Sequence, residues 1–247
     1  MNITAFNASP WGIEGHTNVI VQEFLAGAHN AGAKVRNIPL VEKQINACTG
    51  CGVCFYETPG QCVFKDDMSG LIKSFLGCDA AILATPVYID NVTTLMKTFI
   101  DRLTPILEPY CEKDPAGEYR LRARYKKHPK LMVISCCALP EQSHFQVLRV
   151  FFQRMARTMH TQIVAEIYRP AAGQLLVSKE ESSFKPAVKE YKELLYEAGR
   201  EFVKTGRIGP ETDNKLHQLL IDPDEYVRYA NTMWDRMLPK RSSRVLT

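Results

Sequence analysis

The chain has 247 residues, 45% hydrophobic and 23% charged, a composition typical of a folded globular protein and not of a disordered one. Its net charge of +4 is too small to indicate nucleic-acid binding. It begins with a short apolar run that has no basic flank, and no apolar stretch has the length of a transmembrane helix. We therefore expect no signal peptide, no nucleic-acid partner, no membrane partner and a cytoplasmic location, where a reducing environment also suits the eight cysteines.

Short apolar runs alternate with amphipathic helical stretches along the first two-thirds of the chain. The runs are almost continuously apolar, which is typical of strands in a parallel sheet with helices on both faces. The pattern predicts an α/β fold, a flavodoxin-like doubly wound five-stranded parallel sheet, whose ligands bind at the carboxyl ends of the strands. We expect strands at residues 3–8, 34–40, 79–85, 131–137 and 162–168, and helices at 17–31, 67–76, 93–107, 143–159 and 186–204.

The expected flavodoxin-like domain spans residues 1–204 and carries a cysteine-rich loop insertion at about 45–65. A C-terminal helical extension follows at 205–247, with too many apolar residues for a free tail, so we expect it to pack on the sheet domain or on a neighbouring subunit. Residues 110–130 form a polar excursion in which basic residues alternate. A hairpin there would have one positive face, which is either simply solvated or attracts an acidic electron carrier or a nucleotide phosphate.

Four cysteines lie in one short run: Cys48, Cys51 and Cys54 at two-residue spacing, then Cys62 after seven residues. Ferredoxins use the same opening run to hold a cubane iron–sulfur cluster. Four thiolates also suit tetrahedral zinc, and four reduced thiols that hold no metal are a third possibility. Zinc sites more often pair two C-x2-C units across a longer gap, so the spacing favours a 4Fe–4S cluster.

The segment between the first strand and the first helix, residues 9–18, combines hydroxyls, glycines and a helix N-terminus. Backbone N–H groups and the helix dipole there can form an anion site. It has neither the Walker pattern nor the G-x-G-x-x-G dinucleotide turn. The simpler alternative is that Thr17 only caps the helix. The side chains that can donate to a phosphate are Ser9, His16, Thr17 and Asn18.

Three elements, in this order, resemble the iron–sulfur flavoprotein branch of the flavodoxin-like NAD(P)H-dependent FMN reductase family. The resemblance covers about residues 1–200. It departs from the family pattern at His16, where asparagine is more usual, and in the third loop, which lacks the common glycine-rich turn. The matching elements are the loop Ser9 to Thr17, the cysteine run ending in Lys65-Asp66-Asp67-Met68, and the block from Pro86-Val87-Tyr88 through Lys97 to Asp101-Arg102.

The resemblance implies that each chain holds one FMN and one 4Fe–4S cluster. The first loop would hold the FMN phosphate through Ser9, His16 and Thr17, with help from the Trp11 amide. Four cysteines, Cys48, Cys51, Cys54 and Cys62, would ligate the cluster. The second loop and the third loop, residues 136–142, would surround the isoalloxazine ring; their residues at the ring are Pro86, Val87, Tyr88, Asn91, Cys137 and Ala138.

The implied function is that of a flavin-dependent oxidoreductase that couples a two-electron donor to one-electron carriers. The cofactors carry the chemistry, so we expect no catalytic side chain. The expected partners are NAD(P)H or a ferredoxin-like carrier. The resemblance also implies a homodimer or homotetramer in which the cluster loop of one subunit approaches the flavin of another.

Two alternatives remain open from the sequence. One is a plain NAD(P)H-dependent FMN or quinone reductase whose cysteines are structural. The other is a zinc-stabilised binding module on a flavodoxin-like scaffold without flavin. For the remaining polar residues we expect structural roles: Asp101 and Arg102 as a salt bridge, Asp66 and Asp67 as a helix start, and Cys136 with Cys137 as core residues.

Overall fold

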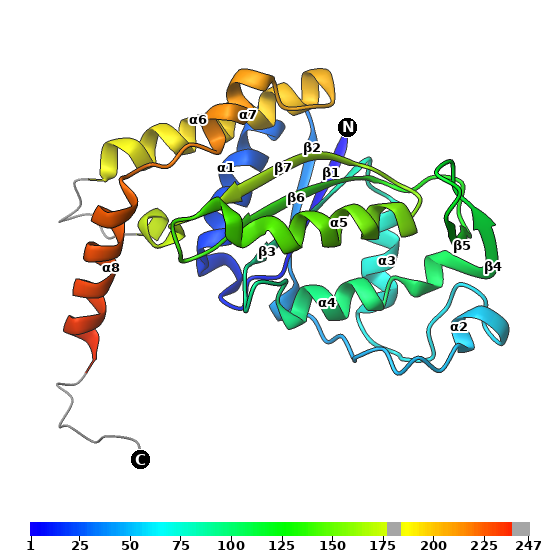
Figure 1. The fold of residues 1–247 in the computed structure, drawn as a ribbon. Coiled ribbons are helices and arrows are strands. Elements are labelled where there is room, and N and C mark those ends of the chain that lie inside the picture. Colours follow the sequence, from blue (N-terminus) through cyan, green and yellow to red (C-terminus); the bar gives the residue numbers. More distant parts are fainter. Residues whose placement is uncertain (177–183, 239–247) are drawn as a thin grey trace, which may run out of the picture.

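The computed structural model describes residues 1–176 and 184–238. Its centre is a five-stranded parallel sheet in the order β2-β1-β3-β6-β7, which confirms the predicted flavodoxin-like α/β fold (Figure 1). The strands are almost fully buried along β1, β3 and β6, as expected for a sheet covered on both faces. Their bounds are β1 (Asn2–Asn7), β2 (Lys34–Pro39), β3 (Ala80–Pro86), β6 (Lys130–Cys136) and β7 (Ile163–Arg169).

Helices α1 (His16–Asn30) and α6 (Lys185–Thr205) cover one face of the sheet. They cross closely because each has a glycine at the contact: a Cβ on Gly27 would lie 1.8 Å from the backbone oxygen of Tyr196, and one on Gly199 would lie 2.1 Å from that of Phe24. The other face is covered by α3 (Met68–Leu76), α4 (Thr94–Asp101) and α5 (Gln146–Thr158).

The predicted helix at 93–107 is too long. It ends at Asp101, and a 3-10 turn over Thr104–Ile106 follows, because Pro105 has no N–H with which to continue an α-helix. The chain then forms an antiparallel hairpin of β4 (Leu107–Lys113) and β5 (Tyr119–Ala123) within the predicted polar excursion. The helix predicted at 143–159 begins later, at Gln146, after a 3-10 turn over Gln142–Phe145.

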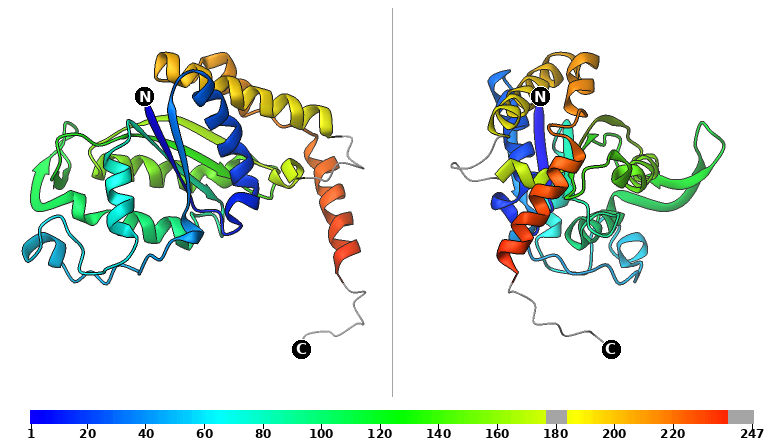
Figure 2. Two further views of the ribbon diagram at one scale, coloured as in Figure 1. Left: turned by 180° about the vertical axis from the view of Figure 1, so that it is seen from behind. Right: turned by 60° about the vertical axis from the view of Figure 1, so that its left-hand side comes forward.

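The C-terminal extension contains α7 (Pro210–Leu216) and α8 (Pro223–Met237); residues 239–247 of the expected extension lie outside the described residues. The start of the extension packs on the sheet domain, since the guanidinium of Arg169, at the end of β7, donates to the backbone oxygens of Leu216 and Gln218. Helix α8 runs away from the sheet (Figure 2). Among helices of the described part of the chain, none is both long and apolar enough to cross a membrane.

Candidate functional site

Three loops meet at the carboxyl edge of the sheet, after β1, β3 and β6. Strands β1 and β3 are neighbours in the sheet, and the chain turns to opposite sides from them: β2 lies beyond β1, and β6 lies beyond β3. This is the topological switch point at which doubly wound sheets bind ligands. The three predicted cofactor loops therefore share one edge of the molecule.

The first loop closes tightly on Ser9, which is buried. The Trp11 N–H donates to the Ser9 hydroxyl at 3.3 Å, and a Cβ on Gly15 would lie only 2.2 Å from the same oxygen. Gly15 is the N-cap of α1 and no side chain caps that helix end. Because the first N–H groups of a helix have no partner within it, this end of α1 can accept an anion.

The three polar residues at the start of α1 have different surroundings. Burial lowers the pKa of His16, so its imidazole is neutral at pH 7. Thr17 lies inside the helix, with its hydroxyl 3.3 Å from the Cys136 sulfur, so the alternative that it caps the helix is wrong. Asn18 braces the loop: its amide donates to the Ile13 carbonyl at 2.7 Å. Which of these side chains contact a phosphate stays a prediction.

The second loop is a two-residue turn between Tyr88 and Asn91, joined by backbone hydrogen bonds of 2.8 and 3.1 Å. Its central residues, Ile89 and Asp90, both have positive φ, at 47° and 54°. A β-branched residue rarely adopts this conformation, and Ile89 is 97% exposed. The Val87 N–H donates to the Cys136 carbonyl at 2.8 Å, which ties the second loop to the third.

Two threonines that the sequence analysis did not single out hold the first two loops together. The Thr93 hydroxyl donates to the Ala8 carbonyl at 2.9 Å, accepts the Met96 N–H at 3.3 Å, and so caps α4 as well. The Thr85 hydroxyl accepts the Thr93 N–H at 3.1 Å. The capping pattern before α4 was the only signal in the sequence that pointed to Thr93.

The third loop begins with two buried thiols, as expected for Cys136 and Cys137. Burial raises their pKa to about 11 and about 12, so both stay protonated at neutral pH. The Cys137 sulfur donates to the Leu139 carbonyl at 3.2 Å. Ala138 is exposed, and its carbonyl accepts the Tyr226 hydroxyl of α8 at 2.7 Å. The C-terminal extension thus touches the edge where the cofactor loops meet.

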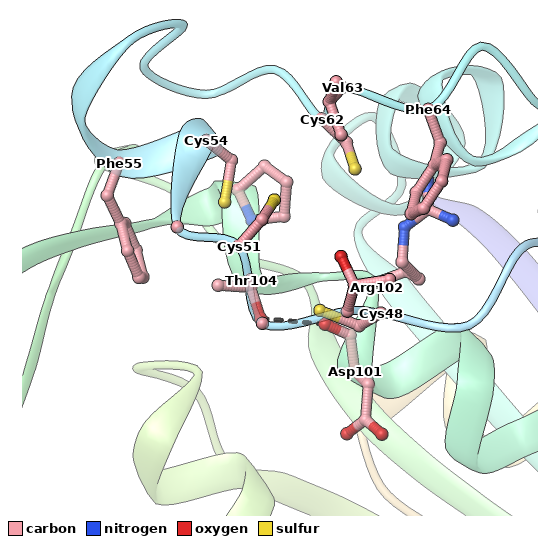
Figure 3. A pocket seen from close by; sticks show the side chains of 14 residues that line it. Cys48, Cys51, Cys54, Phe55, Cys62, Val63, Phe64, Asp101, Arg102 and Thr104 are labelled. Carbon is pink, nitrogen blue, oxygen red and sulfur yellow. Dashed lines mark hydrogen bonds between the residues drawn. The ribbon is translucent and has the colours of Figure 1, made fainter.

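All four cysteines of the short run line one cavity of about 150 Å³, and Figure 3 shows their sulfurs around one opening. Cys48 and Cys51 lie on irregular backbone, and Cys54 lies in the short helix α2 (Val53–Tyr56). The turns between them need left-handed backbone, which Gly50 and Gly52 adopt at φ 68° and 75°. The two glycines therefore let the closely spaced thiols converge.

The thiols of this cavity influence one another electrostatically. Burial raises the pKa of Cys54, and the neighbouring sulfurs of Cys62, Cys48 and Cys51 raise it further, because a second nearby negative charge is unfavourable. Yet within residues 1–176 and 184–238 no three His, Cys, Asp or Glu side chains stand close enough together to hold a single metal ion. The sulfurs share a cavity without meeting at one point.

The expected salt bridge between Asp101 and Arg102 is wrong. Asp101 pairs with Lys97, one turn earlier on α4, at 2.7 Å, whereas Arg102 pairs with Asp66 at 2.8 Å. Consecutive helical residues point in different directions, so they do not face each other. Asp66 has a second role near the predicted helix start, since its carboxylate also accepts the Met68 N–H at 3.1 Å.

The cysteine cavity and the cofactor loops lie at opposite ends of α4. The turn at Tyr88–Asn91 precedes that helix, while Asp101 and Arg102, at its far end, line the cavity. Eight helical residues span about 12 Å. Figure 1 shows α2 and the β4–β5 hairpin at the end of the molecule opposite to the carboxyl ends of the strands. Within one chain the two sites are therefore separate.

Several basic residues of the β4–β5 region are already engaged in ion pairs or hydrogen bonds within the chain. Arg120 pairs with Glu112 at 3.0 Å, and Lys127 pairs with Asp79 at 2.7 Å. The Arg124 guanidinium donates to two backbone carbonyls, of Pro105 and Leu107, next to the cysteine cavity. The positive face is thus weaker than its sequence indicated.

The five-stranded parallel sheet, with three loops at its switch point, places the protein in the class of flavodoxin-like doubly wound folds. Residues 1–122 match the family described as NADPH-dependent FMN reductase. This match, over just under half of the chain, bears out the resemblance seen in the sequence.

Several curated relatives are named iron–sulfur flavoproteins. One from Archaeoglobus fulgidus is 44% identical over 91 residues, which cover 37% of this chain and 40% of the relative. Another from Methanocaldococcus jannaschii is 33% identical over 106 residues, covering 43% of this chain and 53% of that protein. The chain thus spans about half the length, or less, of these relatives in the matched segments.

Solved structures show the same fold at low sequence identity. An FMN-dependent NADH-azoreductase from Bacillus anthracis in complex with FMN has a TM-score of 0.59 at 12% identity, covering 82% of this chain and 99% of the azoreductase. An NAD(P)H:quinone oxidoreductase from Methanothermobacter marburgensis has a TM-score of 0.56 at 11% identity, covering 82% and 96%. At these identities the likeness establishes the fold alone.

Proposed function

We propose that the chain is an FMN- and iron–sulfur-dependent oxidoreductase that couples a two-electron donor to one-electron carriers. The observation that carries this proposal is the presence of two separate sites of matching chemistry: an anion-accepting edge at the switch point, and a cavity lined by four thiols. The family and the names of the relatives support the same pair of cofactors.

The first loop fits the phosphate of FMN. Gly15 allows the loop to close on Ser9 without a side chain in the way, and the uncapped end of α1 offers backbone donors to an anion. We propose that Ser9, His16 and Thr17 lie at the phosphate together with the Trp11 amide, and that Asn18 shapes the loop beside it. The neutral imidazole of His16 can donate one hydrogen bond without adding charge.

We propose that the flavin ring lies between the second and third loops. The exposed turn after β3 places Tyr88 and Asn91 beside Pro86 and Val87, and the hydrogen bond from Val87 to Cys136 fixes its distance from the third loop. In this proposal these residues orient the ring, with Cys137 and Ala138 on its other side. The bound flavin supplies hydride and electron transfer, while the protein supplies position and hydrogen bonds.

The cysteine cavity fits an iron–sulfur cluster better than one zinc ion. Zinc holds each thiolate at about 2.3 Å, so its ligands meet at one point. A cubane places iron and sulfide atoms between its thiolates, which therefore stand farther apart. The four sulfurs here line one cavity of about 150 Å³, their donor set is purely cysteine, and three of them follow at two-residue spacing. Cys48, Cys51, Cys54 and Cys62 are the proposed ligands of a 4Fe–4S cluster.

The proposed partners are NAD(P)H or a ferredoxin-like carrier and further copies of the chain. Because α4 separates the two sites of one chain, a homodimer or homotetramer that brings one chain's cysteines to another's flavin edge would shorten the electron path.

The decisive experiment is an absorption spectrum of anaerobically purified protein, with iron, sulfide and flavin measured on the same sample. We expect flavin bands on a broad brown shoulder and about four irons and four sulfides per FMN. Flavin without iron, even after cluster reconstitution, would instead identify a plain NAD(P)H-dependent FMN or quinone reductase. A colourless protein with one zinc per chain would refute both redox assignments.

A further inference from the structure

Arg102 and Arg169 are the largest fully buried side chains of the described residues; Arg102 has 1% of its side chain exposed although it carries a charge. A buried charge is unfavourable unless it is paired and hydrogen-bonded. None of the roles proposed above uses this residue. Its contacts therefore call for an explanation of their own.

The guanidinium joins the two ends of the cysteine loop. It donates to the Asn46 carbonyl at 2.6 Å, before the first cysteine, and to both oxygens of Asp66 at 2.8 and 3.0 Å, after the last cysteine. The two ends also bind each other, since the Asn46 backbone and side-chain N–H groups donate to Asp66 at 2.9 and 3.0 Å. A bidentate arginine–carboxylate pair of this kind is strong and fixed in geometry.

A second pair of hydrogen bonds closes the base of the loop just outside this contact. The Gln44 N–H donates to the Asp67 carboxylate at 2.8 Å, and the Asp67 N–H donates to the Gln44 carbonyl at 3.1 Å. All four cysteines lie between these closures. The position of the thiols therefore depends on the contacts around Arg102.

Arg102 also faces the thiols. It lines the cysteine cavity beside Phe64, as Figure 3 shows from close by. Its guanidinium carbon lies 5.0 Å from the centre of the Phe64 ring. Asp66, in contrast, is not among the residues that line the cavity. Of these two charged side chains, the guanidinium is therefore the one that faces the cavity lined by the sulfurs.

We propose that Arg102 is a positioning residue for the cysteine site: it holds the loop of residues 46–66 closed and places a fixed positive charge beside Cys62, which raises the reduction potential of the cluster held there. This inference rests on the proposed function. One-electron reduction adds a negative charge to the site, and a nearby buried cation stabilises the reduced form. Net charge and hydrogen bonding to the sulfurs are known determinants of cluster potentials.

The test is a redox titration of the cluster signal by electron paramagnetic resonance in three variants. Asp66→Asn leaves the positive charge without its partner and should shift the potential upward. The double variant Asp66→Asn/Arg102→Met should shift it downward. Arg102→Lys keeps the charge but not the bidentate geometry, so its potential should stay closer to the wild type than that of the double variant.

Lys97→Met is the matched control, because it removes one positive charge from the same helix. The Lys97 side chain is 52% exposed and pairs with Asp101, so solvent should screen its loss and the potential should not move. If loosening of the loop were the only effect, the reduction potentials of Asp66→Asn and of the double variant would shift in the same direction. That result, or shifts no larger than in Lys97→Met, would overturn the proposed role of the charge.

Hydrogen exchange of residues 44–66 in cluster-free protein tests whether Arg102 holds the cysteine loop closed. We call this closure by Arg102 and Asp66 the clasp. We expect faster exchange in Arg102→Lys and in the double variant, and unchanged exchange in Lys97→Met; unchanged exchange in all of them would refute the clasp. If Asp66→Asn does not fold, the double variant and Arg102→Lys still decide the outcome. A wild-type chain that takes up no iron or sulfide would refute the proposed function and the charge effect together, while faster exchange would then support the clasp alone.

Discussion

The two ends of α4 are built in different ways. At its N-terminal end lies the proposed flavin edge, formed by the loops after β1, β3 and β6, which the sheet holds in place through hydrogen bonds such as Thr93 to Ala8 and Val87 to Cys136. At its C-terminal end, the cysteine loop is largely exposed, and its base is closed by the buried pair of Arg102 and Asp66. A ligand edge built on parallel strands is shaped by the whole core, whereas a loop insertion depends on a few contacts. The two ends should therefore respond differently to substitution.

Replacing one proposed cluster ligand should have the largest effect of these substitutions, and the effect should be confined to the cysteine site. Cys51→Ala should lose nearly all iron and sulfide, because a cubane needs four protein ligands, and it should keep FMN. Iron, sulfide and flavin per chain give the result. Cys111→Ala, an exposed cysteine outside the cavity, is the control and should keep both cofactors. An intact cluster in Cys51→Ala would remove that residue from the ligand set.

Loss of the buried carboxylate should destabilise the protein strongly. Asp66→Asn leaves Arg102 uncompensated, so the free energy of unfolding at pH 7 should fall by about 3–5 kcal/mol. Urea unfolding measures it, with Asp101→Asn as the control, since its exposed pair with Lys97 contributes less than about 1 kcal/mol. A loss as small as in the control would show that the pair is not essential.

The pH dependence of this difference has a defined sign. Burial would raise the pKa of Asp66, but the hydrogen bonds from Arg102 and Asn46 outweigh it and hold that pKa well below its usual value. A lowered carboxyl pKa stabilises the fold above the unfolded value of about 3.9, and this stabilisation is lost as the pH falls further. Wild type and Asp66→Asn should therefore converge in stability below about pH 4. Parallel stability curves down to low pH would contradict the assignment.

At the flavin edge, Gly15→Ala should weaken FMN binding and leave the cysteine end unchanged. Its Cβ would lie 2.2 Å from the Ser9 hydroxyl, so the first loop must open. We expect the Kd for FMN to rise about tenfold to hundredfold, which corresponds to a loss of about 1.4–2.8 kcal/mol in binding free energy. Quenching of FMN fluorescence measures it. Gly70→Ala on α3, where no atom lies within 4 Å of the added Cβ, should bind FMN as the wild type does.

The smallest effect concerns the contact between the extension and the third loop. Tyr226→Phe removes the hydrogen bond to the Ala138 carbonyl and should lower the free energy of unfolding by about 1 kcal/mol. Thermal unfolding measures this loss. Tyr110→Phe, at an exposed tyrosine, should change nothing. Equal stability of both variants would show that α8 is not coupled to the flavin edge.

Most of the fold could be predicted from the sequence because apolar runs and helical periodicity are local signals. All five strands of the sheet lie within a residue or two of their expected bounds. The helix at 93–107 was predicted too long, since its apolar pattern continued past Asp101 while Pro105 ended the helical backbone. The position of the cofactor loops could be predicted because ligands bind where strands end at a switch point.

The partners of buried charges could not be predicted in this way. Asp101 and Arg102 are neighbours in sequence, yet each pairs elsewhere, because side-chain direction on a helix separates adjacent residues. Thr93 gave only the signal of a helix cap and Thr85 gave none, although together they connect the loops after β1 and β3. Such contacts depend on distances between segments far apart in the chain.

The sequence by itself determined the kind of chemistry: the four-cysteine run, the loop around Gly15 and the order of strands and helices are local patterns with direct physical meaning. Only the tertiary structure decided how the two sites are arranged. It placed them at opposite ends of α4 and closed the cysteine loop on Arg102, a residue outside the cysteine motif. The reason is that burial and charge pairing are set by the packing of the whole chain, which no local pattern records.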